Sequence, residues 1–375
     1  MMARFGIYKN ISKCFSTLGQ GLRLDIQNIE GEKKIEQDTK NVTLRGIKMK
    51  GMNEDMPALI FFPDIFDSAE NWMSFFINSR NPILNMRDVY IIYPRNQGTS
   101  DWCNTISSEP AEDIVSDIER FMYVNKISTA TLGGHGFGAK NALLMGCYKP
   151  HLMTGLLALN WAPQDYTYFR SGHNLKDYLD QICSIENLEN MSFKDFRSTL
   201  EEKIQNLKIR TLLEQQFKLN DKGKRQMMFN KELLNERIDD LVSWKSSYGV
   251  YGGRSRFIFP DSSEMVHLGT NTLSMMKVCT QNRGYLEDIK TIDVGNNDNP
   301  EYNHWIYEDN HLADQAAFHS CEFIHKFDGV NVLLKNRAEM REGFKIPVLK
   351  SESKDGTGAS VAPEHYHHNW RFNSK

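Results

Sequence analysis

From about residue 41 onward, short apolar runs alternate with longer stretches in which apolar residues recur at helical spacing. Consecutive apolar residues bounded by polar turns fit strands that are buried on both faces. Such runs occupy residues 58–62, 89–93, 128–132, 155–160, 255–259 and 289–294. The periodic stretches predict helices over residues 111–125, 138–148 and 312–327. Alternating strands and helices predict the α/β class, with a mostly parallel central sheet and helices on both of its faces.

The pattern changes between residues 166 and 250, where strand signals are few and amphipathic patterns extend over 196–217 and 231–244. We therefore expect a helical cap, residues 166–250, inserted into a core built from 41–165 and 251–327. The last stretch, 328–375, contains glycines and prolines with little periodicity, which predicts an extended C-terminal tail.

The N-terminal segment, residues 1–40, has a different character again. Its first 24 residues include Arg4, Lys9, Lys13 and Arg23 and no acidic residue, and aromatic and leucine side chains recur at roughly helical spacing. This composition is typical of a mitochondrial transit peptide, although an ordinary basic helix has the same features. The favoured prediction is a mitochondrial protein on the matrix side, peripheral to the inner membrane.

Composition excludes several function classes. The 45 Lys and Arg residues nearly balance the 48 Asp and Glu residues, so no global charge favours nucleic acid as a partner. No apolar run reaches the 18 residues of a membrane-spanning helix. The six cysteines form no C-x-x-C pair, which argues for a reducing compartment rather than a disulfide framework or a zinc ribbon.

The most informative motif is Gly-His-Gly-Phe-Gly-Ala-Lys at residues 134–140. A nucleophile elbow is written Gly-x-Ser-x-Gly, because its central residue sits on a sharp strand-to-helix turn that needs small neighbours. Gly134 and Gly138 keep these small neighbours, whereas Gly136 stands where the serine would be. Glycine has no side-chain atom that could attack a carbonyl carbon and hold an acyl group.

Three further segments accompany the elbow, in order along the chain. They read Pro-Asp-Ile-Phe-Asp-Ser-Ala-Glu-Asn-Trp at 63–72, Pro-Arg-Asn-Gln-Gly-Thr-Ser at 94–100 and Asn-His-Trp-Ile at 303–306. Together with the elbow they resemble the α/β-hydrolase superfamily, in particular the small acyl-hydrolase branch that includes the mitochondrial abhydrolase domain-containing protein eleven and bacterial esterases. The resemblance covers about residues 41–165 and 250–327, and it implies an α/β-hydrolase fold with a helical cap.

The resemblance also implies where the catalytic groups would stand. His304 corresponds to the imidazole base. The orienting acid corresponds either to Asn160, where an amide replaces the carboxylate, or to the loop after the strand at 255–259, where Asp261 or Ser263 could reach the histidine. The sequence leaves this choice open.

The oxyanion loop is altered as well. Pro63 lacks an N–H, and a carboxylate at Asp64 would oppose developing negative charge, although backbone donors of Ile65 or Phe137 could survive. Nucleophile, acid and oxyanion loop thus all depart from a working site, and we expect no ester or amide hydrolysis.

These observations predict a catalytically inactive scaffold that requires no cofactor. We expect an accessory subunit of a mitochondrial multiprotein assembly, contacted through the N- and C-terminal extensions, with a respiratory-chain complex as the leading candidate. The alternative is a non-hydrolytic enzyme of lyase or cofactor-free oxygenase type that uses His304 as its base, with Asp261 beside it.

His365, His367 and His368 form the one histidine cluster, which is a weak candidate for a metal site. We expect this cluster instead to be solvated or to contact a partner.

Overall fold

The computed structural model describes residues 26–29, 42–77, 87–103, 110–261, 263, 265–266, 274–275, 278–279, 289–292 and 314–324, apart from 52, 54, 169, 221 and 222. All of them belong to the first of two compact units, residues 1–328. The second unit, residues 329–375, has no described residue, so the predicted C-terminal tail lies outside the description.

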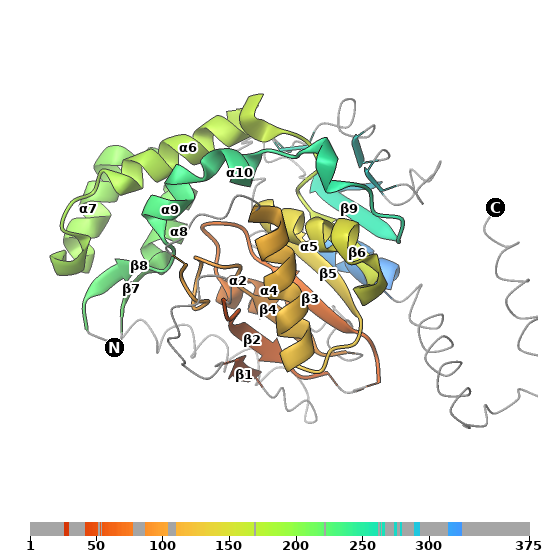
Figure 1. Cartoon of the computed structure of the whole chain (residues 1–375). Helices are drawn as coiled ribbons and strands as arrows, with labels where there is room; N and C mark the ends of the chain where they lie inside the picture. Colours follow the sequence, from red (N-terminus) through yellow and green to blue (C-terminus); the bar gives the residue numbers. More distant parts are fainter. Residues whose placement is uncertain are drawn as a thin grey trace, which may run out of the picture. The chain divides into compact units, whose positions relative to one another are not determined.

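One eight-stranded sheet organises the described chain, with strand order β1-β2-β4-β3-β5-β6-β9-β10 (Figure 1). β1 and β2 pair antiparallel, as do β2 and β4, and every other neighbouring pair is parallel. The strands are β1 (Ile26–Ile29), β2 (Gly46–Met49), β3 (Ala58–Phe62), β4 (Val89–Ile92), β5 (Ala130–His135), β6 (Met153–Leu159), β9 (Ser255–Pro260) and β10 (Ile289–Ile292). The predicted mostly parallel sheet is confirmed.

The apolar runs form strands because both faces of the sheet are covered. All residues of β3, β4, β5 and β9 are buried. Side chains alternate between the two faces along each strand, and in β3 Ile60 and Phe62 belong to one apolar cluster whereas Leu59 and Phe61 belong to the other. The strands at the centre of the sheet therefore supply side chains to two separate cores.

Each face of the sheet has its own helices. α4 (Pro110–Val124) and α5 (Phe137–Tyr148) pack in the cluster that contains Ile60, together with the cap. α2 (Ala69–Ile77) and the helical residues 314–324 pack in the cluster that contains Phe61. The expected helix over 312–327 is therefore present in its described part.

Two strands were not anticipated. β2 carries only a short apolar alternation, and β1 lies inside the segment 1–40 that we expected to be an extension. Backbone pairing places β1 in the sheet, with Ile26 opposite Met49 and Ile29 opposite Gly46. The segment 1–40 therefore contributes one edge strand to the core.

The cap follows β6 and contains most of the remaining helices. They are α6 (Arg170–Cys183), α7 (Phe193–Lys203), α8 (Leu207–Gln216), α9 (Lys231–Glu236) and α10 (Ile238–Val242), with short 3₁₀ turns at Tyr166–Tyr168, Leu188–Asn190 and Ser246–Tyr248. Figure 1 shows them as an arch over one side of the sheet. No helix in the described part of the chain combines the length and the apolar character that a bilayer crossing needs.

The helical patterns at 196–217 and 231–244 were each expected to be continuous, and each is interrupted. The first is interrupted after Lys203, the last residue of α7. Asn206 then begins α8, because its side chain accepts hydrogen bonds from the backbone N–H groups of Lys208 and Ile209. The chain then forms an antiparallel hairpin of β7 (Phe217–Leu219) and β8 (Arg225–Met227), which the cap prediction did not include.

Candidate functional site

The loops that carry three of the four motifs, at residues 63–72, 94–100 and 134–140, follow parallel strands, so their backbones emerge at one edge of the sheet; the motif at 303–306 lies outside the described residues. Pro63 and Asp64 follow β3, Gly136 follows β5, Asn160 follows β6 and Asp261 follows β9. In sheets of this class, ligands bind outside the carboxyl ends of the strands. The topology therefore brings most of the predicted site residues to the edge where such sites form.

The elbow is the turn between β5 and α5. Gly136 has φ 52° and ψ −131°, which glycine adopts freely and other residues adopt only under strain. A Cβ on Gly134 would lie 2.4 Å from the backbone carbonyl carbon of Gly138, and a Cβ on Gly138 would lie 2.2 Å from the carbonyl oxygen of Phe62. The two outer glycines are thus required where backbone segments approach closely.

The carboxylate of Asp64 stands where a side chain at position 136 would be. A Cβ on Gly136 would lie 2.0 Å from Oδ2 of Asp64 and 2.4 Å from its Cγ. Asp64 Oδ1 accepts hydrogen bonds from the backbone N–H groups of Ile65, at 2.9 Å, and Phe137, at 3.0 Å. In an α/β-hydrolase, the N–H after the nucleophile and an N–H of the loop after the third strand form the oxyanion hole. One carboxylate therefore occupies both the place of the nucleophile and the corresponding pair of oxyanion donors.

The surroundings of Asp64 set its charge. Only 9% of the residue is exposed. Burial raises the pKa of its carboxyl group to about 6, although the hydrogen bonds from Ile65 and Phe137 act in the opposite direction. The group is therefore mainly ionised at pH 7, and it lies at the N-terminus of α5, where the helix dipole favours a negative charge. The Asp64 carboxylate therefore acts as an anion that the protein itself places at an anion-binding turn.

The structure also brings together two of the positions that were alternatives for the orienting acid. Asn160, fully buried and with φ 50°, accepts a hydrogen bond through Oδ1 from Ser263 Oγ at 2.5 Å. Ser263 Oγ in turn accepts hydrogen bonds from the N–H groups of Met265 and Val266, both at 3.1 Å. Asp261 is exposed, and its backbone N–H donates to the carbonyl of Ile292. An amide and a hydroxyl therefore occupy the buried acid positions.

The predicted histidines cannot be placed in this way. His304, His365, His367 and His368 all lie outside the described residues. Within the described residues, no three His, Cys, Asp or Glu side chains are grouped as metal ligands would be. His135, next to Gly136, is fully buried at the end of β5, and its ring centroid lies 5.2 Å from that of Trp72.

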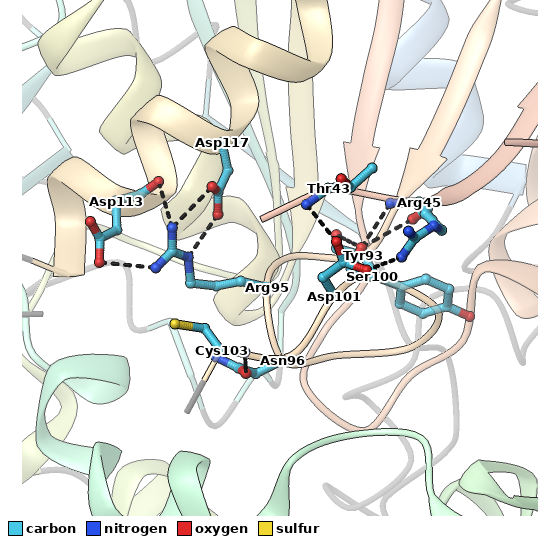
Figure 2. A network of polar contacts seen from close by, with 10 residues as sticks. All are labelled: Thr43, Arg45, Tyr93, Arg95, Asn96, Ser100, Asp101, Cys103, Asp113 and Asp117. Atoms are coloured by element: carbon cyan, nitrogen blue, oxygen red, sulfur yellow. Dashed lines mark hydrogen bonds and ion pairs between the residues drawn. The ribbon is translucent and has the colours of Figure 1, made fainter. Parts of the chain in front are cut away.

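The loop after β4 carries the second motif and is held by polar contacts (Figure 2). Arg95 donates through Nε and Nη2 to both carboxylate oxygens of Asp117, at 2.7 and 2.9 Å, and through Nη1 to Asp113 at 2.9 Å. Burial raises the pKa of Asp117 to about 6, although the ion pair with Arg95 lowers it. The forked contact ties the loop to α4.

The end of the same loop is fixed to the chain before β2 (Figure 2). Ser100 Oγ donates to the carbonyl of Tyr93 at 2.6 Å and accepts from the N–H of Arg45 at 2.8 Å. Asp101 accepts from the N–H of Thr43 at 3.1 Å and pairs with the Arg45 guanidinium. Ser100 and Asp101 thus position backbone at the end of this loop.

The cap is joined to two of these loops by hydrogen bonds. Gln216, at the end of α8, donates through Nε2 to the carbonyl of Asp67 at 2.9 Å. Asn230 donates its backbone N–H to the carbonyl of Asn96 at 2.9 Å. The cap therefore contacts the loops after β3 and β4 directly.

Lys140, the last residue of the elbow motif, provides a third connection. Its Nζ donates to the carbonyls of Leu241, at 3.2 Å, and Ser243, at 2.7 Å, and also to that of Asp240. These carbonyls belong to the C-terminal part of α10 and the residues after it, where a helix leaves carbonyls without intrahelical partners. Burial lowers the pKa of Lys140 to about 7. The elbow helix thus anchors the cap through a buried amine.

Comparison with solved structures supports the fold that the sequence predicts. The chain is similar to a marine microorganism esterase (20% identity over 68% of this chain and 90% of that one, TM-score 0.58). It is also similar to an α/β hydrolase from Novosphingobium aromaticivorans, with 12% identity over 80% of this chain and 99% of that one and a TM-score of 0.51. A third similar structure is an epoxide hydrolase from Vigna radiata, with 12% identity over 82% of this chain and 100% of that one and a TM-score of 0.54. This chain has the α/β-hydrolase fold. No family model matches the sequence.

Two features of this α/β-hydrolase-fold site were not recognised in the sequence. Gln216 carries no local signal, because its contact with Asp67 joins residues that are far apart in the chain. Lys140 was interpreted only as part of the elbow motif, although a lysine in a largely buried helix of the core predicts an internal partner.

Proposed function

We propose that this chain is a catalytically inactive α/β-hydrolase-fold protein that acts as a structural scaffold. One observation carries the proposal: the carboxylate of Asp64 accepts hydrogen bonds from Ile65 and Phe137 and fills the space beside Gly136. An acyl-transfer site needs a nucleophile in that space and two donors directed at the reacting oxygen. Here the space and the donors are used by the protein itself.

Three contacts between cap and core support the scaffold role. Gln216, Asn230 and Lys140 each connect the cap to a segment that would line an active site. An enzyme whose substrate enters beneath a cap benefits from a cap that opens, whereas a scaffold benefits from a fixed surface. A cap held to the core on several sides fits the second role.

For the cellular setting, we propose an accessory subunit of a mitochondrial multiprotein assembly, with a respiratory-chain complex as the leading candidate. The proposal rests on the basic, acid-free first 24 residues and on the sequence segments that extend beyond the α/β core. Such segments can wrap large partner surfaces with little demand on the core.

The catalytic part of the proposal is tested by restoration. Hydrolysis of p-nitrophenyl acetate is measured for the wild-type protein, for Gly136→Ser and for Gly136→Ser combined with Asp64→Gly, each against the buffer rate. The wild type has no nucleophile at position 136, and in the single variant the carboxylate of Asp64, although displaced by the new side chain, still leaves a negative charge close to where the oxyanion would form. Both are therefore expected to give the buffer rate. Wild-type turnover that is abolished by Asp64→Asn would show an active site and overturn the proposal.

The scaffold part is tested by the native mass of the endogenous protein in gently solubilised mitochondria. We expect it to migrate in a native gel with a complex far larger than the 43.4 kDa chain, together with a constant set of proteins identified by mass spectrometry. Migration as a monomer would contradict the scaffold role and favour the alternative of a non-hydrolytic enzyme with His304 as base.

A further inference from the structure

One end of the cap carries an aromatic side chain between two arginines. Phe193, the first residue of α7, is 36% exposed. The guanidinium carbons of Arg197 and Arg225 lie 5.4 and 5.9 Å from its ring centroid. Arg225 stands opposite Leu219 in the β7–β8 ladder, and Leu219 is 59% exposed. We call these four residues the cap-end patch. In Figure 1 α7 and the hairpin lie at the end of the cap opposite β9.

The two arginines of the cap-end patch differ in their pairing. Arg197 forms a forked contact with Glu214, with Nε–Oε1 3.0 Å and Nη2–Oε2 2.6 Å. Arg225 lies over the rings of Phe193 and Phe217, and no carboxylate in the described part of the chain pairs with it. The patch therefore carries a net positive charge on a planar group that aromatic rings hold in place.

We propose that the cap-end patch is the docking surface for another protein subunit, which presents a carboxylate side chain next to an apolar side chain. The carboxylate would bind the Arg225 guanidinium through two parallel hydrogen bonds, and the apolar group would contact Phe193 and Leu219. Arginine and aromatic residues contribute most of the binding energy in many protein interfaces. This inference rests on the proposed scaffold function and identifies where the scaffold binds.

The neighbouring charges favour a protein carboxylate over a phosphate-rich partner. Lys224 is adjacent to Arg225 but already pairs with Glu189 at 2.7 Å, and Lys218 is 3.6 Å from Glu70. A membrane or nucleic acid is bound by many available cations together. Around Arg225, the described residues instead combine one unpaired guanidinium with apolar side chains.

The test replaces the endogenous protein by full-length variants in the source cells and measures the fraction that migrates with the large assembly in native gels. Arg225→Glu is expected to reduce that fraction at least tenfold, and Phe193→Ser is expected to reduce it severalfold. Tyr123→Ser is the matched control, because Tyr123 is 84% exposed on α4, and it should leave the fraction unchanged. Thermal unfolding of each purified variant shows whether it is folded.

The partner is then identified with a photo-crosslinking residue at position 219. We expect crosslinks to one subunit near an Asp or Glu, and changing that acid to Lys should restore assembly of Arg225→Glu.

If the wild type assembles and folded Arg225→Glu assembles equally well, the proposed docking surface is wrong while the scaffold function stands. If the wild type is monomeric, both are wrong. Arg225-dependent binding to anionic phospholipid vesicles, without a protein crosslink, would also overturn the docking proposal.

Discussion

Two loops at the same edge of the sheet differ in what their motif residues do. In the loop after β4, Arg95 joins the loop to α4, and Asn96 and Ser100 hydrogen-bond to backbone groups and so position the chain. At the elbow, Gly136 offers no side-chain nucleophile, and the carboxylate of Asp64 from the loop after β3 fills the space beside it. The comparison teaches that motif residues of such a fold can serve two purposes, holding the loops in place or doing chemistry, and under the proposed scaffold function only the first purpose is needed.

The largest effect is expected from the retained loop. Replacing Arg95 with Met leaves the carboxylates of Asp113 and Asp117 without their forked partner, and Asp117 is almost fully buried. Breaking a buried ion pair on one side typically costs about 3–5 kcal/mol. Urea unfolding should show a loss of this size.

The matched control for that experiment is Arg197→Met, because Arg197 forms a similar forked contact with Glu214 on the surface of the cap. Its unfolding midpoint should stay close to that of the wild type, since exposed ion pairs contribute little. Equal effects of the two substitutions would mean that the loop after β4 is not under the structural constraint that we infer.

The next effect concerns the altered elbow. Gly136→Ser introduces a side chain at φ 52° and forces Asp64 to move away from its two donors. Strain and displacement together should cost about 3 kcal/mol. Asp64→Gly in the same chain should recover part of the loss, and a double-mutant cycle in urea should give a coupling of about 1–3 kcal/mol. Strictly additive effects would show that the two positions do not share one space.

A smaller effect should appear in the pH dependence of stability. The pKa of Asp64 is raised from 3.8 to about 6 in the folded protein, so the folded state holds this proton more tightly than the unfolded state does. Stability contributed by the protonated group is therefore lost as the pH rises from about 4 to about 6, and it stays lost above that range. Asp64→Asn removes the titration and keeps an oxygen for the donors.

The free energy of unfolding of Asp64→Asn, relative to that of the wild type, should consequently rise by on the order of 2 kcal/mol between pH 4 and pH 7. The measurement is the free energy of unfolding of both proteins at several pH values. Asp117 titrates in the same window, but it is present in both proteins and cancels in the difference. If the free energies of unfolding of the two proteins changed with pH in parallel, the raised pKa of Asp64 would be contradicted.

The sequence predicted the α/β core well because its strands are short apolar runs that both faces bury. The run at 58–62 is found as β3 with the same bounds. The strand predicted at 128–132 is instead Ala130–His135, because Gly133 and Gly134 continue the ladder with Leu157 and Ala158 although they have no apolar side chain. Backbone pairing of this kind leaves no hydrophobic signal.

The sequence showed where the site departs from the elbow motif, but it did not show the geometry of the site. Gly136 and the exchange at Asp64 are visible in the sequence, and we expected Asp64 to oppose a developing charge. The structure adds what the sequence could not show, that the carboxylate accepts hydrogen bonds from Ile65 and Phe137, a direction set by the loop conformation. Likewise, Asn160 and Ser263 looked like alternatives because residue spacing does not show that the loops after β6 and β9 meet.

The smallest predicted effect concerns that meeting point. Ser263→Ala removes the hydroxyl that donates to Asn160 and accepts from Met265 and Val266, and it should cost about 1–2 kcal/mol in urea unfolding. Ser184→Ala, in an exposed position, is the control and should be nearly neutral. A neutral Ser263→Ala would mean that the contact between Asn160 and Ser263 does not hold the loops after β6 and β9 together. A measurable loss would place Asn160 and Ser263 with the retained loop after β4, as polar residues kept because they hold two loops together.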